Sequence, residues 1–228
     1  MWKFIVGVIA LIVILGGGYW FLKGSGSGQT TTDTYGYNQT ADSTNSPQAT
    51  STDSNPSNST NPITITKNMK AIFHTSLGDI TVEFFNDQAP KTVENFVKLA
   101  SEKFYDGTKF HRVIKGFMDQ GGDPLTKDDS MQARWGTGGP GYTIADEFGT
   151  AYTNMAGTIA MANTGAPNSS GSQFFFNAVD NHFLDGKYSV FGKVTSGMDI
   201  VTAINNVQTD ANDRPLTPVV LKSVTITQ

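Results

Sequence analysis

The sequence predicts a mainly-β domain, folded as a closed or nearly closed barrel, that follows an apolar segment and a polar linker. Residues 67–228 contain many short strand-like runs and only two helical patterns, a set of elements that is typical of a barrel. The rest of the 228-residue chain divides by composition into an apolar stretch, 1–23, and a stretch of small polar residues, 24–66. Only the third zone can bury a core, and its length suits a single domain.

The apolar stretch has the length of a membrane span. Phe4–Leu22 is a run of 19 uncharged residues, which as a helix would measure about 28 Å, close to the bilayer hydrocarbon thickness of about 30 Å. We expect this segment to be an uncleaved transmembrane helix. The alternative is a cleaved signal peptide, with the small residues Ser25 and Ser27 in the place of a cleavage site.

The polar stretch predicts a disordered linker. Residues 24–62 contain no Val, Ile, Leu, Met or Phe, so burial cannot offset the entropy lost on ordering them. A flexible coil of this length spans roughly 35 Å, which suits a domain held off the outer face of a membrane. We therefore expect a single-pass protein of the cell membrane with its folded domain, 67–228, outside the cytoplasm. If the first segment is cleaved, the protein is secreted instead.

The folded zone begins with a hairpin and a helix. Residues 72–75 and 80–84 alternate in polarity around the turn Ser76–Asp79, which predicts a β-hairpin. Residues 91–104 then carry apolar side chains at helical spacing, and Pro90 stands at a first-turn position. A helix is expected there.

Loops and short strands make up the rest of the domain. Gly107 follows the first helix and precedes an apolar strand, and residues 121–149 form a glycine-rich loop. Two short strands, a third strand, a second helix and a closing strand are then predicted in turn at 157–162, 173–176, 188–194, 198–207 and 220–227.

Composition and spacing exclude several function classes. The absence of cysteine rules out disulfides, thiolate zinc sites and a cysteine nucleophile. A net charge of −4 gives no electrostatic footprint for nucleic acid. His74, His111 and His182 do not stand at metal-ligand spacing. Gly136–Gly141 satisfies G-x-G-x-x-G, but a proline interrupts it and a strand-like run follows, so a turn is predicted there. We expect neither a metal nor a cofactor.

One stretch sets an arginine among large apolar side chains. This stretch is FHRVIKGFMDQGGD at 110–123, and it is followed by WGTGGPGY at 135–142, MANTGAPNSSGSQFFF at 161–176 and LDGKYSVFGKV at 184–194. In this order the four motifs resemble those of the cyclophilin-type peptidyl-prolyl cis-trans isomerases, and APKTVENF at 89–96 is also similar to that family's helix start.

The resemblance runs from about residue 70 to the C-terminus. It implies an eight-stranded antiparallel closed β-barrel capped by two α-helices. It also implies that Arg112 is the catalytic arginine and that Gln120 is the glutamine that orients it. The family's proline pocket falls on five apolar residues: Ile114, Phe117, Met118, Phe175 and Leu184. The rim that binds the peptide backbone falls on Ala162, Asn163 and Gln173, with Gly136 near the groove.

Several positions depart from the common family pattern. Phe183 and Tyr188, which belong to the same substrate groove, stand where many eukaryotic members carry tryptophan and histidine, and both are seen in bacterial members. The resemblance is therefore to a bacterial-like cyclophilin, and cyclosporin binding is expected to be weakened by Phe183. The loop 164–167 is one residue longer than is common, and 125–134 is an insertion for which the sequence suggests no function.

An apolar pocket whose one charged side chain is an arginine suits the isomerase reaction, because a guanidinium donates hydrogen bonds without moving protons. We expect a peptidyl-prolyl cis-trans isomerase that acts, as a monomer, on proline-containing polypeptides and assists the folding of exported proteins. The alternative is a non-catalytic module, a chaperone or scaffold that binds proline peptides without accelerating rotation.

Overall fold

Alternating burial builds the strands of the domain, as the first hairpin shows. The computed structural model describes residues 68–228, and in it β1 (Lys70–Thr75) pairs antiparallel with β2 (Asp79–Phe84). Ala71, Phe73 and Thr75 of β1 are buried, and half-buried residues stand between them. Burial at every second residue packs one face of a sheet on a core. The predicted hairpin is confirmed.

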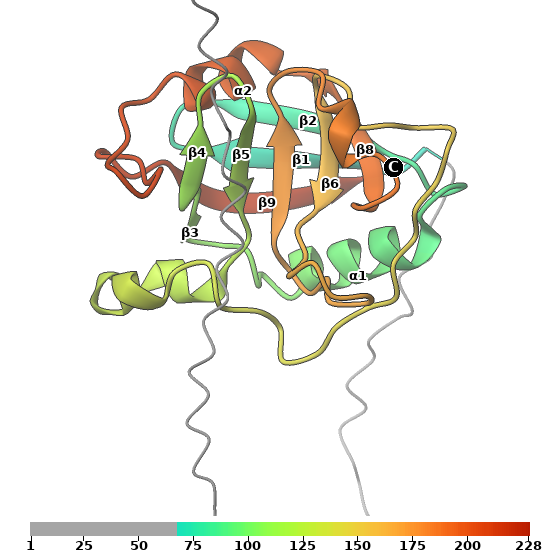
Figure 1. Cartoon of the computed structure of the whole chain (residues 1–228), viewed down its shortest axis with the longest axis horizontal. Coiled ribbons are helices and arrows are strands. Elements are labelled where there is room, and N and C mark those ends of the chain that lie inside the picture. Colours follow the sequence, from blue (N-terminus) through green and yellow to red (C-terminus); the bar gives the residue numbers. More distant parts are fainter. Residues whose placement is uncertain (1–67) are drawn as a thin grey trace, which may run out of the picture. The chain divides into compact units, whose positions relative to one another are not determined.

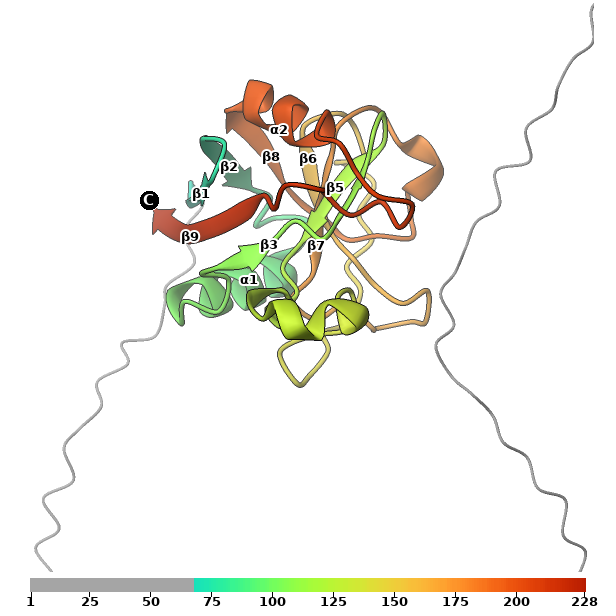
Figure 2. The same ribbon diagram turned by 90° about the vertical axis from the view of Figure 1, so that its left-hand side faces the viewer.

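Nine strands form one antiparallel sheet in the order β3-β9-β1-β2-β8-β6-β7-β5-β4. The sheet curls around the core, as Figures 1 and 2 show from two directions. The other strands are β3 (Thr108–Lys109), β4 (Arg112–Ile114), β5 (Met118–Gly121), β6 (Thr158–Met161), β7 (Phe174–Asn177), β8 (Val190–Ser196) and β9 (Val220–Thr227).

The expected eight-stranded closed barrel is wrong in its strand count. β3 and β4 stand at the two ends of the sheet order, yet only Phe110 and His111 separate them in the chain. The Phe110 N–H donates to Val219 O beside β9, whereas the His111 N–H donates to Gln120 O in β5. The chain changes its pairing partner at this point, so the run 108–114 forms two strands instead of one. The result is a curled sheet whose two edges are consecutive in sequence.

Two α-helices lie at opposite ends of the curled sheet (Figures 1 and 2). α1 (Pro90–Ser101) packs against β9 and β8, and α2 (Met198–Asn205) packs against β2, β5 and β4. The carboxylate of Glu147 accepts hydrogen bonds from the Lys91 and Thr92 N–H groups, which satisfies donors that the first turn of α1 leaves free. Both predicted helices are confirmed, and each ends a few residues earlier than the apolar pattern does.

The core between the sheet and the helices is largely aromatic. Its largest fully buried side chains include Phe73, Phe96, Phe174, Phe176 and Phe191. Phe96 of α1 lies with its ring centroid 5.5 Å from that of Phe73 and 5.9 Å from that of Phe174. Aromatic contacts therefore join the helix to strands from both halves of the sheet.

Two short 3-10 helices occupy the predicted insertion. They are η1 (Pro124–Lys127) and η2 (Asp129–Arg134), and they lie beside β3 at the α1 end of the domain (Figures 1 and 2). Each has an aspartate before its first residue: Asp123 accepts from the Leu125 N–H at 2.7 Å, and Asp128 accepts from the Ser130 N–H at 2.8 Å. Such N-terminal caps make the insertion an ordered part of the domain. A third 3-10 helix, η3 (His182–Leu184), precedes β8.

The predicted membrane anchor, 1–23, and the predicted linker, 24–66, lie outside the described residues. Within 68–228, neither α1 nor α2 has the length and apolarity that crossing a bilayer requires. The prediction that the folded domain begins at residue 67 stays a prediction.

Candidate active site

The hairpin of β4 and β5 carries most of the arginine-containing stretch. Its register sets Arg112 opposite Gln120 and Ile114 opposite Met118. Between these pairs Val113 is buried in the core. Because neighbouring side chains of a strand point to opposite faces, Arg112 and Gln120 share the outer face of the sheet.

Strand β7 divides its phenylalanines between the two faces. Phe174 and Phe176 belong to the main core, whereas Phe175 belongs to a second apolar cluster together with Met118 and Leu184. The run FFF thus supplies both a core and a pocket through the two-residue period of a strand.

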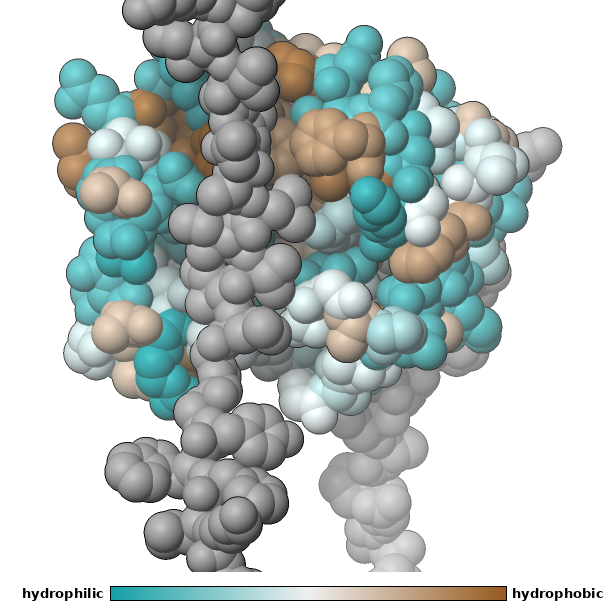
Figure 3. Space-filling view, viewed as in Figure 1, coloured by the Kyte–Doolittle hydropathy of each residue, from teal (hydrophilic) through white to brown (hydrophobic). Residues whose placement is uncertain are grey.

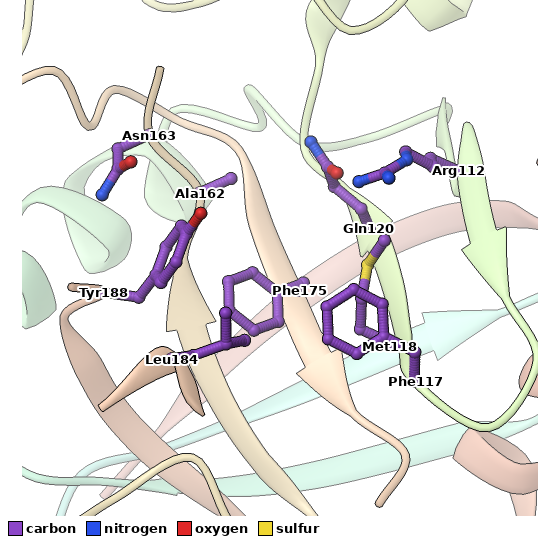
Figure 4. A pocket seen from close by; sticks show the side chains of 9 residues that line it. All are labelled: Arg112, Phe117, Met118, Gln120, Ala162, Asn163, Phe175, Leu184 and Tyr188. Atoms are coloured by element: carbon purple, nitrogen blue, oxygen red, sulfur yellow. The ribbon is translucent and has the colours of Figure 1, made fainter. Parts of the chain in front are cut away.

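A pocket of about 110 Å³ lies on this outer face. It is lined by nine of the predicted site residues, shown in Figure 4: Arg112, Phe117, Met118, Gln120, Ala162, Asn163, Phe175, Leu184 and Tyr188. Arg112 and Gln120 lie together beside Phe117 and Met118, and Asn163 and Tyr188 stand across from them (Figure 4). The structure therefore brings residues of β4, β5, β7, η3 and three connecting segments to one apolar hollow with a cation at its edge.

The other four predicted residues border this pocket. Ile114 packs against its apolar cluster, and Gln173 bonds to Gln120. The carbonyl of Gly136 accepts from Gln173, and Phe183 stacks on Phe117 with ring centroids 5.6 Å apart. The roles of these residues, like those of the nine, remain predictions.

Apolar surface continues beyond the pocket. Phe183 is 58% exposed. In the space-filling view, apolar side chains gather in the half of the face that holds η3 and the turn between β4 and β5 (Figure 3). A peptide crossing the pocket could extend its apolar contacts in this direction.

A chain of hydrogen bonds fixes the amide orientation of Gln120. Gln173 Nε2 donates to the carbonyls of Gly138 and Gly136, at 2.8 and 3.0 Å. Carbonyl oxygens only accept, so Gln173 must turn its own oxygen toward Gln120, whose Nε2 donates to it at 2.9 Å. The remaining group, Gln120 Oε1, lies on the side of the Arg112 guanidinium (Figure 4). Backbone carbonyls thus determine which atom Arg112 meets.

His111, beside Arg112 in the chain, faces the interior. Burial lowers the pKa of His111 to about 4, against the opposing effect of the nearby Asp123 carboxylate. The imidazole is therefore neutral at pH 7 and adds no charge next to the arginine.

A buried carboxyl group ties the β4–β5 hairpin to α2. Asp119 is fully buried, and its Oδ1 accepts from Asn205 Nδ2 at 2.8 Å. Asn205 also donates to Ile114 O at 2.9 Å and accepts from the Gly116 N–H at 2.8 Å. Among residues 68–228, nothing is hydrogen-bonded to Asp119 Oδ2. Burial raises the pKa of Asp119 to about 7, and the hydrogen bond from Asn205 opposes this shift.

Stability is expected to fall with rising pH through Asp119. An unfolded chain releases this proton near pH 4, whereas the folded domain keeps it to about pH 7. Between these values the folded state binds more protons, so each pH unit costs up to about 1.4 kcal/mol from this group. The stabilisation is complete below pH 4 and lost above pH 7. His111, whose pKa is lowered to about 4, contributes the opposite slope up to about pH 6.5, so the test compares wild type with Asp119→Asn by urea unfolding at pH 5, 6, 7 and 8. The stability of Asp119→Asn should rise relative to that of wild type as the pH increases to about 7. An unchanged slope in the variant would contradict the prediction.

Sequence reasoning missed two residues of this region, Asn205 and Asp213. Asp213 Oδ2 lies 3.6 Å from Arg112 Nε. Both residues are far from the hairpin in sequence, and the run around Asp213 carries only a turn signal. Their contacts follow from the packing of α2 and of the loop 208–216 against β4.

The fold and the pocket together fit the class of enzymes that rotate X–Pro bonds. A family model described as cyclophilin type peptidyl-prolyl cis-trans isomerase/CLD matches residues 70–226. The chain belongs to this family. The predicted family and the predicted isomerase activity are confirmed, and the protein is a peptidyl-prolyl cis-trans isomerase.

Relatives come from distant organisms. The chain is 43% identical over 178 residues to a probable peptidyl-prolyl cis-trans isomerase A of Mycobacterium leprae, covering 70% of this chain and 93% of that protein. It is 45% identical over 156 residues to the isomerase CYP71 of Arabidopsis thaliana, covering 68% of this chain but only 24% of that longer protein. A crystal structure of a Cryptosporidium parvum cyclophilin type isomerase, in the presence of the dipeptide Ala-Pro, superposes with a TM-score of 0.63 and 32% identity, covering 70% of this chain and 99% of that one.

Proposed function

We propose that this isomerase accelerates rotation by holding the Arg112 guanidinium at the proline nitrogen while the apolar pocket holds the ring. The observation that supports the proposal is the placement of Arg112 and Gln120, opposite one another across β4 and β5, at the edge of a pocket lined by Phe117, Met118 and Phe175.

The barrier to be lowered is electronic. Resonance gives the peptide C–N bond partial double-bond character, and rotation costs about 18–20 kcal/mol. When the amide twists, resonance is lost and the nitrogen becomes pyramidal with a basic lone pair. A planar imide nitrogen offers a donor almost nothing to bind, whereas the twisted one is a good acceptor.

Arg112 supplies a donor that distinguishes these two states. A guanidinium stays protonated and has several N–H groups in a fixed plane, so it can serve the nitrogen while also meeting Gln120. Only an interaction stronger in the transition state than in the ground state raises kcat. Arg112 is expected to act in this way, and Gln120 is expected to fix the orientation of the guanidinium plane.

The apolar walls provide the second effect. Phe117, Met118, Phe175 and Leu184 enclose the hollow beside Arg112, so a proline ring placed there loses its contact with water. Less water strengthens the hydrogen bond from Arg112. Turnover at about 10–10³ per second requires roughly 4–7 kcal/mol off the barrier. A charge-assisted hydrogen bond in a dry pocket is of this order.

The full chain, purified in detergent, tests this directly. Exchange spectroscopy by NMR on an Ala-Pro peptide measures the rates of cis-to-trans and trans-to-cis rotation at saturating peptide. We expect rates well above those in buffer alone. Peptide binding with rotation no faster than in buffer would favour the non-catalytic chaperone or scaffold instead.

We further propose that proline-containing polypeptides are the substrates, as the Ala-Pro dipeptide with the Cryptosporidium protein suggests. Phe183, half-exposed beside Phe117, is the reason to expect weakened cyclosporin binding in a bacterial-like member. The protein is proposed to act as a monomer. Sedimentation of the full chain in detergent tests the monomeric state. A cyclosporin titration tests the weakened binding.

The location of the enzyme is a separate proposal, supported by the apolar run 4–22 and the polar stretch 24–62. We propose a single-pass membrane protein whose isomerase domain lies outside the cytoplasm and assists the folding of exported proteins. Protease added to intact spheroplasts that express the full chain should degrade the domain. Protection until lysis would place the domain in the cytosol. Recovery of a shortened soluble form would show that the first segment is a cleaved signal peptide.

A further inference from the structure

The loop between α2 and β9 contains a tightly hydrogen-bonded turn. Asp210 Oδ1 accepts from the N–H groups of Asn212 and Arg214, at 2.8 and 3.0 Å. The Asp210 N–H donates to Arg214 O, and the Asp213 N–H donates to Asp210 O. Asp213 adopts a left-handed φ of 61° at the tip. Four hydrogen bonds within these five residues hold the turn in one conformation.

The turn places the carboxylate of Asp213 beside β4, the strand that carries Arg112. The Val113 N–H donates to Asp213 O at 2.8 Å, which fixes the turn on the outer edge of β4. In this position Asp213 Oδ2 lies 3.6 Å from Arg112 Nε. Gln120 Oε1 also lies on the side of the guanidinium (Figure 4), so acceptors from two different segments accompany Arg112.

The same turn is fixed from outside by the segment 124–135, which comprises η1, η2 and Trp135. The guanidinium of Arg214 stacks over the Trp135 ring, with its carbon 5.2 Å from the ring centroid. Arg214 Nη2 also donates to Gln132 O at 3.2 Å. Lys109 Nζ of β3 lies 4.9 Å from the centroid of the same ring and forms an ion pair with Asp129. The segment is thereby anchored to β3 and to the turn.

We propose that Asp213 is a positioning residue for Arg112, and that the segment 124–135 holds Asp213 in place through Arg214. An arginine side chain has several rotatable bonds, and Arg112 is 42% exposed, so packing alone does not fix its direction. A carboxylate at Nε limits the guanidinium to rotamers that face the pocket. This gives the insertion a role in catalysis without contact to substrate.

The inference rests on the proposed role of Arg112, but experiments can distinguish the failure of one from the failure of the other. An exposed ion pair contributes little to stability, so removing Asp213 should change turnover far more than folding. A merely structural Asp213 would show the opposite pattern. If the wild-type chain fails to accelerate rotation, the proposed function fails; if wild type is active and Asp213 is dispensable, only this inference fails.

Asp213→Asn is the first test, since asparagine tolerates the left-handed conformation and keeps the shape of the side chain. NMR exchange on the full chain should show kcat lowered about three- to tenfold. The dissociation constant of the peptide should stay within about twofold of the wild-type value, and the urea midpoint should stay within about one-tenth of it. Glu83→Gln is the matched control, because it removes the exposed Glu83–Lys193 ion pair of β2 and β8 and should leave kcat unchanged. A kcat within twofold of wild type, or a loss confined to peptide affinity, would overturn the proposal.

Trp135→Leu tests the outer link. We expect a two- to fivefold lower kcat in the wild-type background and no further loss in the Asp213→Asn background, because both changes act on the same contact. Arg214→Gln, which leaves the tryptophan in place, should behave in the same way if Trp135→Leu impairs folding. Equal losses in both backgrounds would show that the segment 124–135 does not act through Asp213.

Discussion

Replacing Arg112 with alanine is expected to lower kcat about a hundred- to a thousandfold, while peptide affinity changes by only a few-fold. The size follows from the loss of one preorganised donor to charge that develops in the transition state. Affinity is retained because the ground-state peptide is held by the apolar pocket, and its planar nitrogen accepts almost nothing from Arg112. NMR exchange at saturating peptide gives the rate, and a chemical-shift titration gives the affinity.

Lys115→Ala is the matched control, because Lys115 is an exposed cation of the same hairpin that does not line the pocket. Its kcat should equal that of wild type. Arg112→Lys should lose most of the activity as well, since an ammonium group lacks the planar set of donors. Wild-type rates in Arg112→Ala would remove the guanidinium from the mechanism.

Phe174→Ala is expected to destabilise the domain by about 3–5 kcal/mol. Phe174 is fully buried, and its ring meets those of five aromatic neighbours. Its removal leaves a cavity where α1 and the two halves of the sheet meet, and this site cannot collapse without moving the helix. Urea unfolding measures the loss, and Phe174→Leu gives a smaller value if the alanine variant does not fold.

The neighbouring residue should respond differently. Phe175→Leu keeps an apolar side chain on the other face of β7, where Met118 and Leu184 pack beside it. We expect weaker peptide binding with a modest change in stability. If Phe174→Leu and Phe175→Leu lost stability equally and bound peptide equally well, the assignment of one face to the core and the other to substrate would be wrong.

Local patterns predicted much of this fold. Alternation in 72–75 and 80–84 and the helical spacing in 91–104 identified the first hairpin and α1, because side-chain period and burial coincide there. The pattern could not reveal where 108–114 changes its partner, since no glycine, proline or asparagine interrupts that run. The count of nine strands depends on which distant strands, β9 and β5, receive its hydrogen bonds.

The candidate site was predicted less completely. Residues within the quoted motifs, such as Gln173 and Phe175, could be placed by resemblance. Asp213 and Asn205 could not be placed in this way. Asp213 lies 101 positions from its partner Arg112, and Asn205 lies 86 positions from its partner Asp119. The predicted insertion 125–134 has no sequence pattern that would indicate a contact with Arg214, and the role proposed for it depends on how Arg214 stacks on Trp135.

The pairing of β1 with β9 sets Lys70 opposite Thr227, so the first and last strands of the domain bring its two ends together. A short peptide could join these ends in a circular permutant, with new termini opened in an exposed loop. A reporter fused after Gln228 would likewise emerge on β9 beside the start of β1. No residue of β1 or β9 lines the pocket, so a linker or reporter at these ends leaves the pocket accessible to a long unfolded client.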